Sequence, residues 1–297
     1  LEFRRVLFRS KWTARREAYR ALLESGNCYH PGSVFDPISA RIAEDLGFEC
    51  GMFAGSVASQ TVLGGPDIIL ITLSEFAEQI HRINRALSSM PLMVDADHGY
   101  GNALNVRRTV EELETIGVSG LTIEDTDLPK RYGIGGPPGL ISIEEGVAKI
   151  RSALDARNDT GLAIIARTGA AQITDINDAI ERAKRYEAVG ADAMFFSGIK
   201  TGEEIRAVAS SVSIPIMLGG SGSAPLKTEE LGRLGVRISL QGHYPFMAAV
   251  QATYETLSAL RTGTPPENLE RCADSTIIKE LMRDSDYKKW TKLGLDR

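Results

Sequence analysis

The sequence is poor in cysteine and in long apolar runs, and each shortage excludes a class of protein. Its three cysteines, Cys28, Cys50 and Cys272, are odd in number and form no close pair of the kind that structural zinc sites and redox motifs use. No apolar run approaches the ~18 residues of a membrane-spanning helix, and residues 1–10 lack the apolar core and cleavage site of a secretory signal. We therefore expect a protein of a reducing cytoplasm without a membrane partner.

Positive charge is also scarce. The 297 residues carry 34 lysines and arginines against 39 acidic residues, a formal net charge of -5, and no basic run follows residue 20. A nucleic-acid-binding surface needs clustered basic side chains, so nucleic acid is excluded as a partner and a small molecule is expected. The composition is otherwise that of a folded globular protein, with 43% hydrophobic residues and 29 glycines.

Short apolar segments rich in β-branched residues alternate along the chain with segments that have apolar residues at helical spacing. Eight strands are predicted, at residues 28–35, 50–55, 91–95, 120–124, 163–167, 193–196, 214–218 and 237–240. Helices are predicted between several of them, at residues 74–87, 105–116, 143–156, 176–189 and 203–212. This alternation implies a parallel sheet.

Four helical stretches end in an apolar residue followed by glycine, at Gly47, Gly117, Gly190 and Gly235, just before a predicted strand. Each glycine is predicted to end its helix in the left-handed conformation, which penalises a Cβ atom. Eight strand–helix units in about 250 residues fit a closed (β/α)8 TIM barrel, an α/β fold, better than an open sheet. We predict a non-native leader at residues 1–10, a catalytic barrel at 11–262 and a helical extension at 263–297.

In such a barrel, chemistry comes from the carboxyl ends of the strands, and the third predicted strand runs directly into Asp95 and Asp97. In an extended chain these side chains point to the same side. Two adjacent like charges are unfavourable without a cation between them, so the pair is predicted to bind a hard, oxygen-preferring metal ion. The alternative is that both aspartates cap the next helix.

The next strand ends in Glu124 and Asp125, which suggests a third metal ligand or an acceptor behind the first ligands. Glu124 is the better candidate, because Asp125 points the other way by alternation. Asp67, which follows the second strand in a Gly-Gly-Pro-Asp segment, is either catalytic or the N-cap of a helix.

Two further polar residues follow predicted strands. Arg167 ends the fifth strand, where it either grips a substrate carboxylate with its fork of donors or forms a structural ion pair with the acidic cluster. His243 follows the eighth strand and is either a hydrogen-bond donor to substrate or a satisfied core histidine. The glycine-rich run at residues 219–223 is either a backbone phosphate site or a flexible loop, and the lack of a lysine favours the loop.

Several motifs occur together in one order: GSVAS at 55–59, PD at 66–67, DADHGYGN at 95–102, IED at 123–125, IART at 165–168 and GH at 242–243. In these motifs the chain resembles the isocitrate lyase/phosphoenolpyruvate mutase superfamily, from about residue 28 to residue 246. The resemblance implies that Asp95, Asp97 and Glu124 hold Mg2+, with Mn2+ as an alternative, and that Asp67 lies beside it. It also implies that Ser56 and Val57 meet the carboxylate and oxo oxygens of the substrate.

The loop at residues 130–134 departs from the lyases of this superfamily, which carry a general-acid cysteine there. Tyr132 takes the place of that cysteine and Ile134 that of a histidine, so a thiol-dependent mechanism is not expected. The loop also lacks the asparagine expected for phosphonate chemistry. The likeness is closest to the oxaloacetate decarboxylase branch, although Ser221 stands where that branch has a tyrosine.

The resemblance thus implies Mg2+-dependent decarboxylation of oxaloacetate, or of a close 2-oxo-dicarboxylate, to pyruvate and CO2 through a metal-stabilised enolate. His243, Arg167 and Asp67 are the expected catalytic residues, and Arg167 and His243 also bind the substrate. One alternative is a carbon–carbon lyase of the methylisocitrate or dimethylmalate type, or a related hydrolase, that uses Tyr132. The other is a non-catalytic barrel that binds a carboxylate.

The end of the sequence predicts a helix at residues 247–260, with which the barrel has used its eight units, and another at 275–282 that a closed barrel does not need. The apolar side chains of this last helix, such as Ile277 and Ile278, require a surface to cover them. The resemblance suggests that this extension packs on a neighbouring subunit of a homodimer or homotetramer. Packing on its own barrel is the alternative.

Overall fold

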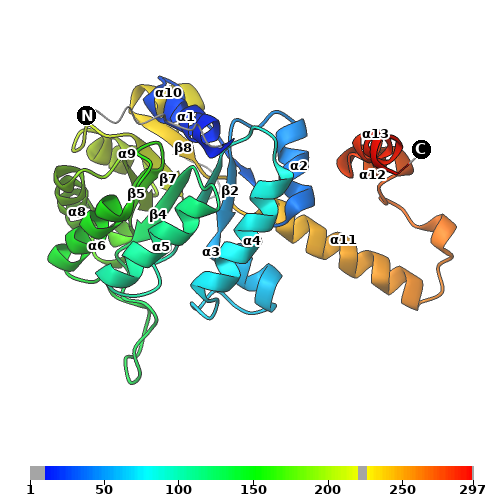
Figure 1. Cartoon of the computed structure of the whole chain (residues 1–297). Coiled ribbons are helices and arrows are strands. Elements are labelled where there is room, and N and C mark those ends of the chain that lie inside the picture. The colour runs from blue at the N-terminus through cyan, green and yellow to red at the C-terminus, as the bar shows by residue number, and fades with distance from the viewer. Residues whose placement is uncertain (1–10, 220–225, 296–297) are drawn as a thin grey trace, which may run out of the picture.

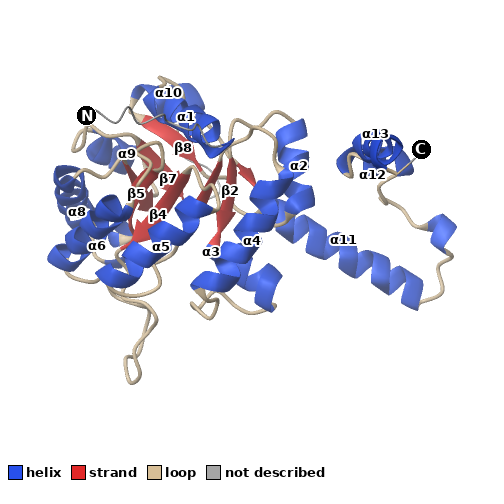
Figure 2. Ribbon diagram, in the orientation of Figure 1, coloured by secondary structure: helices blue, strands red, loops and turns tan. Residues whose placement is uncertain are grey.

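Eight strands of the computed structural model, which describes residues 11–219 and 226–295, form one curled parallel sheet in sequence order (Figures 1 and 2). They are β1 Gly32–Ser33, β2 Gly51–Ala54, β3 Leu92–Asp95, β4 Gly120–Glu124, β5 Ala163–Thr168, β6 Ala193–Ser197, β7 Ile216–Gly219 and β8 Val236–Ser239. The strand β8 returns to the chain ahead of β1, where Tyr29 and Ile238 form an isolated parallel bridge. The (β/α)8 fold class is therefore confirmed, with the first predicted strand shorter than expected.

Most helices pack around the sheet, whereas those after β8 extend away from the barrel (Figure 2). The helices before and between the strands are α1 Lys11–Glu24, α2 Pro37–Asp45, α3 Gly55–Ala58, η1 Ser59–Leu63, α4 Leu73–Ala86, α5 Ala103–Thr115, α6 Ile143–Ala156, α7 Ala170–Ile173, α8 Ile176–Val189, α9 Gly202–Ala209 and α10 Thr228–Arg233. Those after β8 are α11 Tyr244–Arg261, η2 Pro266–Asn268, α12 Ser275–Leu281 and α13 Asp284–Gly294. The predicted helices are confirmed to within a few residues. The four glycines predicted to end helices all have positive φ, from 83° at Gly47 to 102° at Gly190.

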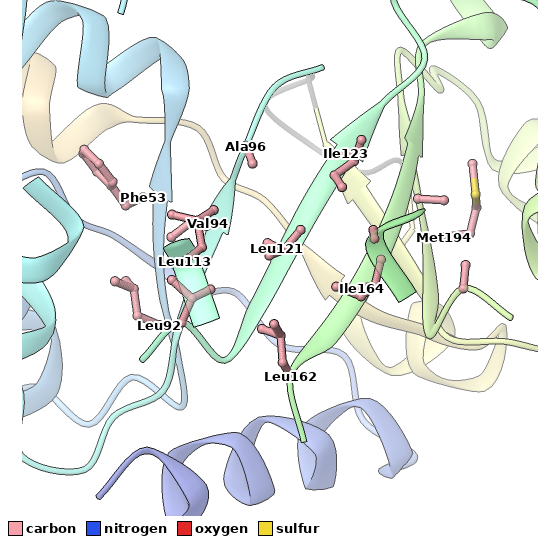
Figure 3. Packing of buried hydrophobic residues seen from close by; sticks show 14 of the residues in the cluster. Phe53, Leu92, Val94, Ala96, Leu113, Leu121, Ile123, Leu162, Ile164 and Met194 are labelled. Carbon is pink, nitrogen blue, oxygen red and sulfur yellow. The ribbon is translucent and has the colours of Figure 1, made fainter. Parts of the chain in front are cut away.

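The apolar core has two parts, because successive side chains of a strand point to opposite faces of the sheet. On the outer face, Leu92 and Val94 of β3 lie beside Leu113 of α5 (Figure 3). On the inner face, Met93 and its neighbours meet Tyr19 of α1, which is fully buried. The helix α1 thus closes the amino-terminal end of the barrel and leaves the carboxyl ends of the strands open for a site.

The C-terminal extension leaves the barrel along α11, none of whose residues is buried (Figure 1). The chain then returns to α2, where Arg283 pairs with Asp45 at 2.7 Å and Arg41 donates to the carbonyl oxygen of Leu281 at 2.7 Å. Other apolar side chains of the extension stay exposed, among them Trp290 at 56%. Within the two described stretches, no helix is both long and apolar enough to cross a membrane.

Candidate active site

A cavity of about 430 Å³ opens at the carboxyl ends of the strands. Its wall brings together most of the residues predicted from the sequence: Ser56, Asp67, Asp95, Asp97, Glu124, Arg167 and His243. Val57 does not line the cavity, because its side chain packs in the apolar core with 1% exposure. The cavity volume lies within the range of small-molecule sites, roughly 300–1,000 Å³.

Asp95 is the last residue of β3 and is held from two sides. Its Oδ1 atom accepts a hydrogen bond from Oγ1 of Thr122 at 2.6 Å, and its Oδ2 atom accepts one from the guanidinium of Arg167. The same guanidinium lies 3.3 Å from Oε2 of Glu124. Arg167 therefore forms the ion pairs with the acidic cluster that were one of the two sequence interpretations, and a contact with substrate stays a prediction.

Asp97 lies in the tight turn after β3 and adopts a positive φ of 47°. Hydrogen bonds from other elements help to hold this turn: the backbone N–H of Glu124 donates to the carbonyl oxygen of Asp97 at 2.8 Å, and Nζ of Lys149 donates to that of His98 at 2.9 Å. Gly55 gives the Asp97 carboxylate its space, since a Cβ atom there would overlap it. No described residue donates a hydrogen bond to that carboxylate, which leaves its oxygens free to bind a ligand.

Helix capping explains neither the aspartate pair nor Asp67. The N-cap of α5, the helix that follows the pair, is Asn102, and the N-cap of α4 is Thr72. Both capping alternatives are therefore wrong. Asp67 instead lines the cavity, where partial burial and then the charge of Asp95 raise the pKa of its carboxyl group.

His243 immediately precedes α11 and faces the cavity. Its Nδ1 atom lies 2.8 Å from Oγ of Ser33 in β1. Burial lowers the pKa of His243 below its usual value, although the negative charges of Asp95 and Asp67 oppose this shift. The imidazole is therefore mainly neutral at pH 7.

The site holds more negative than positive charge. Burial raises the pKa of Asp97 well above its ordinary value, and the charges of Asp95 and Glu124 add to this shift. Burial also raises the pKa of Glu124, although Arg167 opposes it. For Arg167, burial lowers the pKa, but the surrounding carboxylates outweigh burial and the net shift is upward. A buried excess of carboxylates is the environment that a cation stabilises.

An oxygen-only donor set fits a hard divalent cation such as Mg2+, which commonly keeps several waters and binds only one or two carboxylates directly. Among the described residues, no three acidic, histidine or cysteine side chains are placed to hold one ion together. Arg167 forms ion pairs with Asp95 and Glu124, whereas no described residue pairs with the carboxylate of Asp97. The residues therefore fit a hydrated cation better than a fully protein-bound one.

Several features around the site could not be assigned from sequence patterns. Ser33 contacts His243, and Phe195 contacts Arg167, only because the folded sheet brings them together. Arg167 and Phe195 are direct partners across β5 and β6, and the guanidinium carbon lies 5.2 Å from the centre of the Phe195 ring. Thr122 could have been placed near the site from the sequence, because it lies two residues before Glu124 and therefore on the same face of β4.

The remaining residues named from the sequence lie away from the chemistry or outside the described residues. Asp125 points away from the cavity, as predicted, and accepts hydrogen bonds from Tyr186 at 2.8 Å and from Arg182 at 3.1 Å. Tyr132 is fully exposed on the loop between β4 and α6, although Lys130 of that loop lines the cavity. Ser221 and the rest of the run at 220–223 lie outside the described residues.

Comparison with known proteins gives consistent matches over most of the chain. The family model described as phosphoenolpyruvate phosphomutase matches residues 19–261. A protein of Rhodopseudomonas palustris (strain BisB18) named oxaloacetate decarboxylase is 56% identical over 278 residues, which cover 94% of this chain and 96% of the relative. A protein of the same name from Bradyrhizobium diazoefficiens is 55% identical and covers 93% of this chain and 95% of its own length.

Solved structures match over the same region. Phosphonopyruvate hydrolase, solved with oxalate and Mg2+, has a TM-score of 0.83 at 30% identity and covers 95% of this chain and 99% of its own. Oxaloacetate acetylhydrolase, solved with the inhibitor 3,3-difluorooxalacetate, has a TM-score of 0.83 at 27% identity and covers 95% of this chain and 97% of its own.

Proposed function

The chain belongs to the phosphoenolpyruvate mutase/isocitrate lyase superfamily, and on that premise we propose that it is an oxaloacetate decarboxylase, a carbon–carbon lyase that forms pyruvate and CO2. The observation that carries the proposal is the cavity in which carboxylates outnumber the one guanidinium at the mouth of the barrel. Relatives that carry this name are 51–56% identical to the chain over 92–95% of its length.

Asp95, Asp97 and Glu124 are the residues that would surround a divalent cation, Mg2+ or Mn2+, and hold it directly or through its water molecules. Asp97 is the best candidate for a direct ligand, because no described residue occupies its carboxylate. When bound, such a cation supplies Lewis-acid stabilisation of the negative charge that develops as CO2 leaves. Asp67 would add a further carboxylate beside it.

The other residues would bind and orient the substrate. Arg167 and His243 would hold a substrate carboxylate, and Ser56 with the backbone at Val57 would meet the remaining carboxylate and oxo oxygens. The C3–C4 bond breaks, its electron pair stays on C3 and spreads to the C2 oxygen, and C4 leaves as CO2. His243, or a water molecule that it holds, then returns one proton to C3.

Two alternatives are weaker. A lyase of the dimethylmalate type needs a general acid in the loop after β4, but Tyr132 there is fully exposed and does not line the cavity. A non-catalytic carboxylate-binding barrel would not require the free Asp97 carboxylate in a strained turn.

A substrate panel tests the proposal. Purified protein with Mg2+ would be given oxaloacetate, 2-methylisocitrate, 2,3-dimethylmalate and phosphonopyruvate, with pyruvate measured as it forms where the substrate yields it and substrate loss otherwise. We expect saturable turnover of oxaloacetate and at most about 1% of that kcat/KM on the others, since discrimination by contacts to polar groups reaches 10⁴ or more. Preferred turnover of another compound would replace the proposed substrate.

We also propose that the protein works in the cytoplasm as a homodimer or homotetramer in which the C-terminal extension is exchanged between subunits. Helix α11 supports exchange, because it is long, none of its residues is buried, and apolar side chains such as Met247, Val250 and Leu257 are more than half exposed. The cysteines Cys28, Cys50 and Cys272 are all free, which supports a reducing compartment.

A further inference from the structure

Ser33 and His243 form a hydrogen-bonded pair across the seam where the barrel closes. Ser33 ends the short strand β1, and His243 follows β8, 210 positions further along the chain. Their Oγ and Nδ1 atoms lie 2.8 Å apart. Gly242, with a φ of 83°, makes the left-handed turn that aims the next residue at this partner.

The two residues differ in their access to the site. His243 lines the cavity, whereas Ser33 lies behind it and does not. The contact with Ser33 occupies Nδ1 and leaves Nε2 as the ring nitrogen without a partner among the described residues. Any action of Ser33 on a bound molecule must therefore pass through the histidine.

The chemistry of a neutral imidazole makes this contact decisive, because only one ring nitrogen carries a proton. If the Ser33 hydroxyl donates to Nδ1, the proton lies on Nε2 and the cavity receives a donor. The opposite tautomer would present the lone pair of Nε2 to the cavity. That cavity already holds the carboxylates of Asp67 and Asp95, and the substrate that binds there is also an anion, so the lone pair would meet negative charge. The charge around the ring therefore favours Nε2–H, which can donate to a substrate carboxylate.

We propose that Ser33 is a positioning residue for the reaction: its hydroxyl donates to Nδ1 and holds His243 as the Nε2–H tautomer, aimed at the substrate. The effect on the rate rests on the proposed function, whereas the tautomer of His243 does not depend on the identity of the substrate.

The tautomer can be measured directly on the full-length protein. The chain has four histidines, so the ring ¹⁵N resonances can be resolved, and His243→Gln identifies those of His243. We expect a protonated Nε2 and an unprotonated Nδ1 in the wild type. A protonated Nδ1 in the wild type would overturn the proposal, whatever the activity.

Two substitutions then test the role of the hydroxyl group. Ser33→Ala removes one oxygen atom, and Ser33→Thr keeps the hydroxyl as the conservative control. We expect Ser33→Ala to give a mixture of tautomers and to lower kcat/KM for oxaloacetate by ~3- to 20-fold, the effect of losing one hydrogen bond. Ser33→Thr should retain the wild-type tautomer and at least half of kcat/KM.

The outcomes separate this inference from the proposed function. An unchanged His243 tautomer in a folded Ser33→Ala protein would refute the role of Ser33. If Ser33→Ala does not fold, as judged by circular dichroism, the wild-type and Ser33→Thr spectra still decide the tautomer. The expected tautomers without any decarboxylation of oxaloacetate would leave Ser33 as the orienting residue and overturn only the proposed reaction.

Discussion

Replacing Arg167 with methionine would remove the guanidinium that lies between Asp95 and Glu124 while keeping most of the side-chain volume. Removing one partner of a buried ion pair destabilises a fold by about 3–5 kcal/mol, because the remaining charge is uncompensated. The site opens to solvent, so we expect the lower end, about 3 kcal/mol. For a chain of this size that lowers Tm by roughly 6–12 °C in EDTA.

The loss should depend on pH with a definite sign. Burial already raises the pKa of Asp97 and Glu124, and loss of Arg167 would raise that of Glu124 further. A carboxyl group whose pKa is higher in the folded state destabilises the fold above that pKa, and this effect vanishes below its unfolded value of about 4. The difference from wild type should therefore be largest at pH 7 and shrink toward pH 4.

The same Tm measurements in the presence of Mg2+ test whether a cation can replace the guanidinium. Excess Mg2+ should recover most of the lost Tm in Arg167→Met, because the cation replaces the missing charge. Arg182→Met is the matched control: Arg182 pairs with Asp125 behind the sheet at 3.1 Å, so its loss should destabilise the fold without rescue by Mg2+. An unchanged Tm for Arg167→Met in EDTA, or equal rescue of both variants, would refute this view of the site.

Three further effects are expected. Arg167→Ala should lower kcat/KM by ~10²–10³-fold, through loss of a charged contact in the transition state, and unchanged kinetics would leave Arg167 a structural residue. Burial lowers the pKa of His98 to about 4, so as the pH falls the unfolded state takes up the proton before the folded state does. The free energy of unfolding of the wild type should therefore fall by up to roughly 3 kcal/mol between pH 6.5 and pH 4. Urea unfolding of His98→Gln should show a smaller dependence of this free energy on pH. Deleting residues 267–297 should reduce the mass measured by light scattering, and an unchanged oligomer would contradict exchange of the extension.

The sequence was sufficient for the parts of the molecule that local physics decides. Alternating apolar segments located the strands, and the helix-ending glycines Gly47 and Gly190 could be recognised because a positive φ restricts the residue type. The acidic cluster was also predictable, since parallel strands bring their carboxyl ends to one edge. The helix α2 was predicted only through its end at Gly47, and α13, which buries none of its residues, was not predicted.

Pairings between distant elements were not accessible from local patterns. Whether Arg167 meets substrate or Asp95 depends on the register of β3, β4 and β5, and the contact of Ser33 with His243 exists only once β8 reaches the start of the barrel. Asp67 was ambiguous because a loop aspartate before a helix usually caps it. The structure excludes the cap, because the N-cap of α4 lies five residues later, at Thr72, and a catalytic role for Asp67 stays a prediction.

The most direct test compares the wild type with Asp95→Ala at equal protein concentration, following oxaloacetate loss and pyruvate formation with Mg2+ and with EDTA. Metal ions in solution also decarboxylate oxaloacetate, so a protein-free Mg2+ blank is subtracted. We expect saturable turnover by the wild type that EDTA abolishes, and no rate above the blank for Asp95→Ala, with both proteins equally folded by circular dichroism. Equal rates for the two proteins, or a wild-type rate no higher than the blank, would contradict a metal-dependent decarboxylase at this site.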